Sequence, residues 1–154
     1  MQRQELIGLL MAAHGYIEGG IKKLSEEQIA AVPAGKPNNI LWNLGHLASS
    51  LAGVTYPHAG LASPLPANYD SLFKGGTSPS KWEKAPPVGE VVDHFKKILP
   101  QVIADLNAGK FDSFKGFELM PGLTLGSIDQ ALGFHLMHAG MHMNAVGALK
   151  KALA

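Results

Sequence analysis

Three of the chain's seven histidines, His135, His138 and His142, lie near the C-terminus at positions i, i+3 and i+7. In an α-helix this spacing places the three imidazoles on one face. Imidazole is the commonest metal ligand, and residues four apart can present two ring nitrogens to one ion. The pair His138/His142 has that spacing, and the pair His135/His138 is a second possibility. His135 and His142 are about 10 Å apart along the axis, so they are not expected to share an ion. The alternative is that these are core histidines satisfied by ordinary hydrogen bonds.

A third nitrogen ligand is expected from His46. It is the only histidine in a predicted helix that begins at Asn38 or Asn39, and residues 37–69 contain no Asp, Glu, Lys or Arg. Residues 130–149 are equally free of such charges, so both helices are expected to be largely buried. Three neutral nitrogen ligands with open positions are typical of a catalytic metal site. Because the chain has no cysteine, the nucleophile would be a metal-bound water or an external thiol acidified by the ion.

Other metal and haem sites fit the residues less well. A carboxylate-bridged di-iron bundle needs Glu on several helices, whereas Asp129 is the only carboxylate on the last helix. The zincin motif needs Glu after its first His, and position 139 is Ala. A c-type haem needs cysteine. A b-type haem held by His or Met stays open because Met137, Met141 and Met143 lie beside the histidines, although core packing explains these methionines more simply.

Length and composition indicate a single soluble domain spanning residues 1–154. The formal net charge is +1 and Arg3 is the only arginine, so neither nucleic acid nor an anionic membrane is an expected partner. The apolar residues near the N-terminus follow helical spacing and Glu5 precedes them, which argues against a signal peptide. No apolar run is long enough to span a bilayer. We therefore expect a cytoplasmic protein with a small-molecule substrate.

Apolar residues recur every three or four positions in four long segments, which predicts four long helices. These run to about Lys23, from Asn38 or Asn39 to about Tyr56, from residue 88 to residue 106, and from a cap at Thr124 to about Leu153. Ser25 opens a short helix through a capping-box pattern. Residues 57–87 contain six prolines and are expected to form a long connection, and residues 107–122 a second loop without strands. The prediction is an all-α four-helix bundle with a long crossover between its second and third long helices.

Two blocks of the chain resemble the DinB-like (YfiT-type) superfamily of small metal-binding four-helix bundles. The first runs from Leu24-Ser25-Glu26-Glu27-Gln28 to Trp42-Asn43-Leu44-Gly45-His46-Leu47, and the second from Leu123-Thr124-Leu125-Gly126 to His138-Ala139-Gly140-Met141-His142. By position, the resemblance implies that the family's metal triad corresponds to His46, His138 and His142. It also implies an up-down-down-up bundle that is often a homodimer. Characterised members are thiol-dependent S-transferases or isomerases.

The chain departs from the family pattern beside its C-terminal histidines. Ala139 stands where Glu is common, and Met143-Asn144-Ala145 replaces the usual polar tail. His135 is a candidate hydrogen-bond partner of a ligating side chain or an alternative ligand, or it bonds a carbonyl. His14, His58 and His94 are expected to be ordinary helix or surface histidines. The leading hypothesis is a metal-dependent transferase or hydrolase that uses Zn²⁺ or Ni²⁺, with a low-molecular-weight thiol as a candidate cofactor. The alternative is a non-catalytic bundle that acts as a dimeric binding or stress-related module.

Overall fold

A computed structural model describes residues 1–154 and is mostly helical, which confirms the all-α class. Its only sheet is a hairpin of two short strands. In chain order the elements are α1 (Arg3–Ile21), α2 (Glu26–Ala30), α3 (Ile40–Thr55), η1 (Pro57–Ala59), α4 (Tyr69–Phe73), η2 (Pro79–Lys81), α5 (Val88–Asn107), β1 (Phe117–Met120), β2 (Leu123–Leu125) and α6 (Ile128–Leu153). None of the helices combines the length and the apolar character that a membrane span requires.

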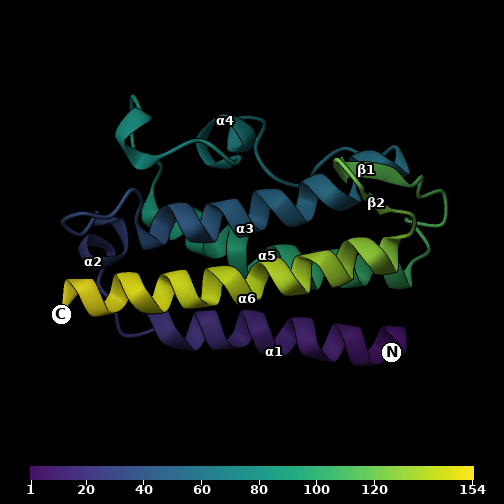
Figure 1. The fold of residues 1–154 in the computed structure, drawn as a ribbon, viewed down its shortest axis with the longest axis horizontal. Coiled ribbons are helices and arrows are strands. Elements are labelled where there is room, and N and C mark those ends of the chain that lie inside the picture. The colour runs from purple at the N-terminus through teal and green to yellow at the C-terminus, as the bar shows by residue number, and fades with distance from the viewer.

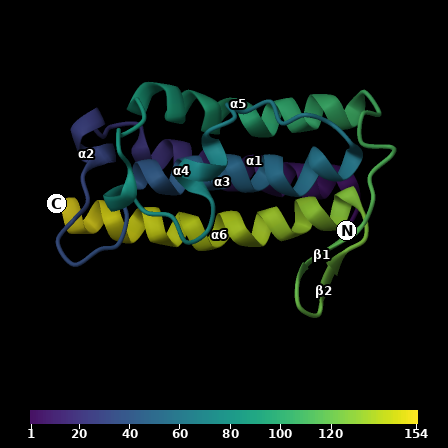
Figure 2. The same cartoon turned by 90° about the horizontal axis from the view of Figure 1, so that it is seen from above.

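The four long helices α1, α3, α5 and α6 lie side by side along the long axis of the molecule (Figure 1). α1 and α6 run in one direction, and α3 and α5 run in the other. α3 packs against both α5 and α6, and α1 packs mainly against α6. Seen from above, α5 and α6 flank α3, and the β1–β2 hairpin projects from the end where α6 begins (Figure 2).

Side-chain caps explain where three of the helices begin. Ser25 and Asn39 cap α2 and α3 as expected, and Asn39 also donates from its Nδ2 to the carbonyl of Ala30, which ties α2 to the start of α3. The cap predicted at Thr124 is wrong, because Ser127 caps α6 and Thr124 lies in β2. Thr124 pairs with Glu118 in the hairpin, so the expectation of no strands is also corrected.

α3 is the most buried helix of the bundle. Leu44, Leu47 and Leu51 are fully buried in a core of 30 apolar residues shared with the other long helices. Only His46, Ser50 and Gly53 of this helix are not buried. These three positions, at i, i+4 and i+7, share one helix face, so the strip of α3 that solvent reaches carries the histidine.

The segment between α3 and α5, expected as a long connection over residues 57–87, contains the short elements η1, α4 and η2. α4 packs on α3, and its Phe73 side chain is fully buried. The Phe73 ring occupies the space above Gly45, where a Cβ atom would overlap it. The Ser49 hydroxyl donates to Asp70 at 2.9 Å, which also holds α4 on α3.

Candidate metal centre

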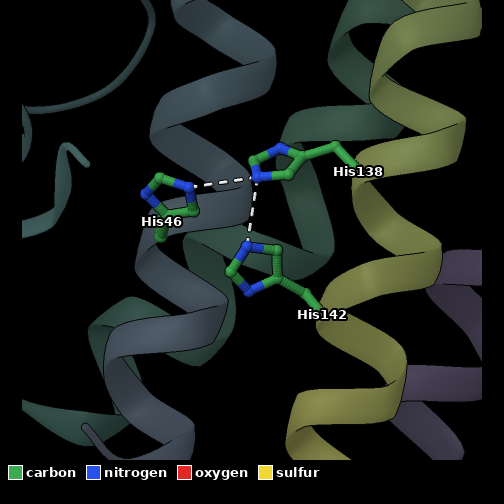
Figure 3. A group of neighbouring side chains, drawn as sticks. All are labelled: His46, His138 and His142. Atoms are coloured by element: carbon green, nitrogen blue, oxygen red, sulfur yellow. Dashed lines mark hydrogen bonds between the residues drawn. The ribbon is translucent and has the colours of Figure 1, made fainter. Parts of the chain in front are cut away.

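Three imidazoles from α3 and α6 converge in the structure (Figure 3). The Nε2 atom of His138 lies 3.2 Å from Nε2 of His46 and 3.1 Å from Nε2 of His142. The ligand atoms of the three residues all lie within 4.8 Å of one another. We call these residues the histidine triad. Of the two pairs that the sequence suggested, the fold therefore brings His138/His142, which are four residues apart, to His46.

Two rings of the triad have a fixed tautomer. Nδ1 of His46 lies 2.6 Å from the carbonyl oxygen of Phe73, and Nδ1 of His142 lies 2.7 Å from Oδ1 of Asn43. Both partners are acceptors, so each Nδ1 carries the proton and each Nε2 holds an unshared electron pair. The amide of Asn43 is itself oriented, because its Nδ2 donates to the backbone oxygen of Asn39 at 2.7 Å.

His138 has a different partner. Its Nδ1 lies 3.1 Å from the Ser50 hydroxyl, which can either donate or accept. Without a cation, a proton on Nε2 of His138 can be donated to His46 or to His142 but not fully to both, so one electron pair stays unmatched. A divalent cation accepts the pairs of all three Nε2 atoms, and Ser50 then accepts the Nδ1–H of His138. The donor set therefore fits a metal ion with three imidazole ligands.

The electrostatic surroundings keep the triad neutral. Burial, together with a smaller contribution from the neighbouring imidazoles, lowers the pKa of His142 to about 3 and that of His138 to about 4. Burial also lowers the pKa of His46, although its hydrogen bond to Phe73 acts in the opposite direction. Metal ligation requires unprotonated nitrogens, so these side chains are ready for it at neutral pH.

Aromatic rings form the walls of the site. The Trp42 ring stacks on His46 with centroids 4.7 Å apart and planes at 10°, and the Phe134 ring stacks on His138 at 5.6 Å and 24°. Met137 and Met141, on the α6 face that carries Phe134, are exposed, so the expectation that they pack in the core is wrong for both. Ala139 is fully buried and faces the core. The hydrogen-bond partners of the three rings are a backbone carbonyl, an amide and a hydroxyl, all of which are uncharged.

The structure places His135 outside the triad. It is fully buried, and its Nε2 lies 3.0 Å from Nε2 of His14, which is 3% exposed. His135 still neighbours His138, with ring centroids 6.4 Å apart. His14 was expected to be an ordinary helix or surface histidine. It lies on α1 but is buried there, against Phe95 of α5 and His135 of α6, so the surface position is wrong.

The two remaining histidines also lie elsewhere. His58 stacks on Phe117 of the hairpin, and Nδ1 of His94 is hydrogen-bonded to the hydroxyl of Tyr69 at 2.6 Å.

Sequence reasoning missed the residues that orient the triad. Asn43 and Ser50 stand three residues before and four residues after His46, which is the spacing of one helix face, so this signal was available. The contribution of Phe73 comes from its backbone carbonyl and has no sequence signal of this kind.

Comparison with known proteins places this arrangement in a family. A comparison with curated proteins found no match. A family model described as the DinB superfamily matches residues 11–146, a span that includes all three residues of the histidine triad. The resemblance noted in the sequence is therefore confirmed, and the chain belongs to the DinB superfamily.

Proposed function

We propose that the protein binds one divalent metal ion, Zn²⁺ or Ni²⁺, through the Nε2 atoms of His46, His138 and His142, and that it acts as a metal-dependent transferase or hydrolase. The observation that carries the proposal is the pair of acceptors behind the rings. The Phe73 carbonyl and the Asn43 amide hold the protons of His46 and His142 on Nδ1, which leaves the converging Nε2 atoms free to bind. When bound, such an ion supplies an open position at which a water molecule or a small thiol loses its proton near neutral pH.

The chain's own residues define what else the site offers. Phe73, Asn43 and Ser50 orient the three rings, while Trp42 and Phe134 shield them from bulk water. No acidic or basic side chain forms a hydrogen bond to the triad. The bound ion would therefore lower the pKa of the water or thiol by itself, and the released proton would pass to solvent. An external thiol is consistent with the absence of cysteine.

Metal content of the untagged protein tests the binding proposal. We expect close to one equivalent of metal in the wild-type protein and its loss in His138→Ala. The matched control is His94→Ala, which removes a histidine outside the triad and is expected to retain the metal. Full occupancy in His138→Ala would refute the proposal.

A second candidate function is a non-catalytic metal-binding module, favoured by the uncharged partners of the triad. The two functions differ in whether the bound ion has an open position. We expect the Co²⁺-substituted protein to develop a thiolate-to-cobalt absorption band when 2-mercaptoethanol is added. A spectrum unchanged by the thiol would favour the non-catalytic module.

We further propose an up-down-down-up bundle that forms a homodimer and acts on a small molecule. The directions of the four long helices in Figure 1 support the topology. Exposed apolar side chains on α1 and α6, among them Leu9 and Tyr16, support an association between two copies. Sedimentation at micromolar concentration tests the dimer, and a purely monomeric profile would reject it.

A further inference from the structure

A hollow of the molecule lies between α1 and α5, away from the histidine triad on α3 and α6. It has a volume of about 400 Å³, within the usual range for small-molecule sites. Most of its lining surface is apolar and includes Met11, Leu99, Ile103 and Ala104, and the side chains of Glu18, Lys96 and Asn107 also line it. Gly15 also lines it and leaves it open, because a Cβ atom at this position would meet no other atom within 4 Å. We call this hollow the α1–α5 groove.

The one deeply buried polar side chain that lines the groove is His14. Its ring stacks on Phe95 with centroids 4.8 Å apart and planes at 6°, and its Nε2 is engaged by His135 at 3.0 Å. These contacts fix the ring and leave Nδ1 as its one polar atom without a hydrogen-bond partner in the protein.

The proton on the His14–His135 pair can be located from a second unpartnered atom. Nδ1 of His135 is fully buried and has no hydrogen-bond partner. A buried N–H without an acceptor is rarer and costlier than a buried nitrogen that only lacks a donor, so His135 carries its proton on Nε2. His135 therefore donates to Nε2 of His14, and the proton of neutral His14 resides on Nδ1. Burial lowers the pKa of His14 to about 4, which keeps the ring neutral at pH 7.

The wall opposite His14 offers an acceptor. Pro100 lies inside α5 and lines the groove together with Lys96. Because proline has no N–H, the carbonyl oxygen of Lys96 loses the hydrogen bond that an ordinary helix would give it. The α1–α5 groove thus combines apolar walls with an N–H donor on one side and a backbone acceptor on the other.

We propose that the α1–α5 groove is a binding site for a small, flat, uncharged molecule whose carbonyl or ring-nitrogen acceptor receives the Nδ1–H of His14. The apolar body of such a ligand packs against Leu99 and Ile103, and a donor on the ligand, where present, faces the Lys96 carbonyl. The site uses α1 and α5, so it does not depend on the proposed metal function.

The test compares two probes that differ only in the acceptor. 1-Indanone carries a carbonyl, and indane has the same fused rings without it. Titration of the full chain at pH 7.5, followed by ¹H–¹⁵N spectra, is expected to show saturable binding of 1-indanone with shifts centred on residues of the groove. In His14→Phe, which keeps an aromatic ring against Phe95, the preference for 1-indanone over indane is expected to fall about threefold to tenfold, as for one lost hydrogen bond.

A second variant keeps the proposal testable should His14→Phe fold poorly. Gly15→Leu fills the groove and is expected to abolish binding of both probes. Gly8→Leu adds the same side chain to the same helix outside the groove, where a Cβ also meets nothing, and is expected to bind as the wild type does. The proposal is overturned if 1-indanone does not bind the wild type, if the preference between probes is the same in His14→Phe, or if Gly15→Leu binds like Gly8→Leu.

Discussion

Gly45 is the residue through which the packing of α4 controls the orientation of His46. A Cβ atom at this position would lie 2.5 Å from Cζ of the Phe73 ring, closer than side-chain carbons approach in proteins. Phe73 is fully buried, so its ring cannot turn aside into solvent. In Gly45→Ala, the ring and the backbone that carries it must move away from α3. The Phe73 carbonyl moves with them, and it now lies 2.6 Å from Nδ1 of His46.

Two opposing terms set the effect of Gly45→Ala on stability. Overpacking a core typically costs about 1–3 kcal/mol. Replacing glycine by alanine inside a helix returns about 1 kcal/mol. The net loss in the free energy of unfolding is therefore expected to be about 0–2 kcal/mol for the metal-free protein, measured by urea denaturation.

The effect on metal affinity is expected to be larger and more specific. Loss of a hydrogen-bond partner behind a ligating histidine usually weakens binding about 10–100-fold. A competition titration with a chromophoric chelator measures this change in the dissociation constant of Zn²⁺. In the double variant Gly45→Ala/Phe73→Leu, the smaller side chain makes room for the added methyl, so part of the lost affinity is expected to return.

The matched control is Gly53→Ala, at an exposed position eight residues further along the same helix. A Cβ atom at Gly53 meets no other atom within 4 Å, so this variant is expected to gain up to about 1 kcal/mol of stability. Its metal affinity is expected to equal that of the wild type. Wild-type affinity in Gly45→Ala, or an equal loss in both variants, would show that the Phe73 carbonyl does not orient His46.

Three further predictions concern other contacts. Asn43→Ala removes the acceptor behind His142 and is expected to weaken Zn²⁺ binding about 10–100-fold in the chelator titration; an unchanged affinity would contradict the role given to this amide. The pKa values of His14 and His138 are lowered to about 4 and that of His142 to about 3, so the unfolded chain takes up more protons below pH 6.5. The metal-free protein is therefore expected to lose at least about 1.4 kcal/mol of stability per pH unit between pH 6 and 4 in urea denaturation, and a flat profile would refute this. Asp105 is buried, accepts hydrogen bonds from Tyr56 and Gln101, and forms an ion pair with Lys110. Asp105→Ala is therefore expected to lower the free energy of unfolding by about 2–4 kcal/mol without altering metal affinity. The control Asp93→Ala breaks the exposed ion pair with Lys97 and is expected to lower it by about 0.5 kcal/mol or less.

Much of the fold and the convergence of the triad followed from patterns within single helices. The charge-free character of α3 predicted its burial, and the spacing of His138 and His142 predicted a shared face. The same expectation was wrong for α6, which buries one face and exposes Met137 and Met141. Local capping chemistry located the starts of α2 and α3 correctly. At α6 the predicted cap, Thr124, is held in the hairpin by pairing with Glu118, and Ser127 caps the helix instead.

Other features depend on contacts between elements, which no local pattern encodes. The hairpin strands are three and four residues long, too short for alternation to be recognised. The His14–His135 pair joins residues 121 positions apart, and it forms because α1 packs on α6 in a particular register. α4 lies within a proline-rich segment with no periodicity, so neither its helix nor its contact with His46 had a sequence signature.

The partner of His46 is a main-chain oxygen, and this affects how the site responds to mutation. Alanine scanning changes side chains, so a scan through residue 73 would report on the aromatic ring and leave the hydrogen-bond acceptor itself in place. A mutation can test this acceptor only by displacing the backbone that carries it. A side chain added at Gly45 would do so, because it would collide with the Phe73 ring. A change at Thr77 is a second route, because its hydroxyl is hydrogen-bonded to the carbonyls of the residues on either side of Phe73 at 3.0 and 2.8 Å. Variation among natural sequences at position 73 would for the same reason understate how strongly this peptide group is constrained.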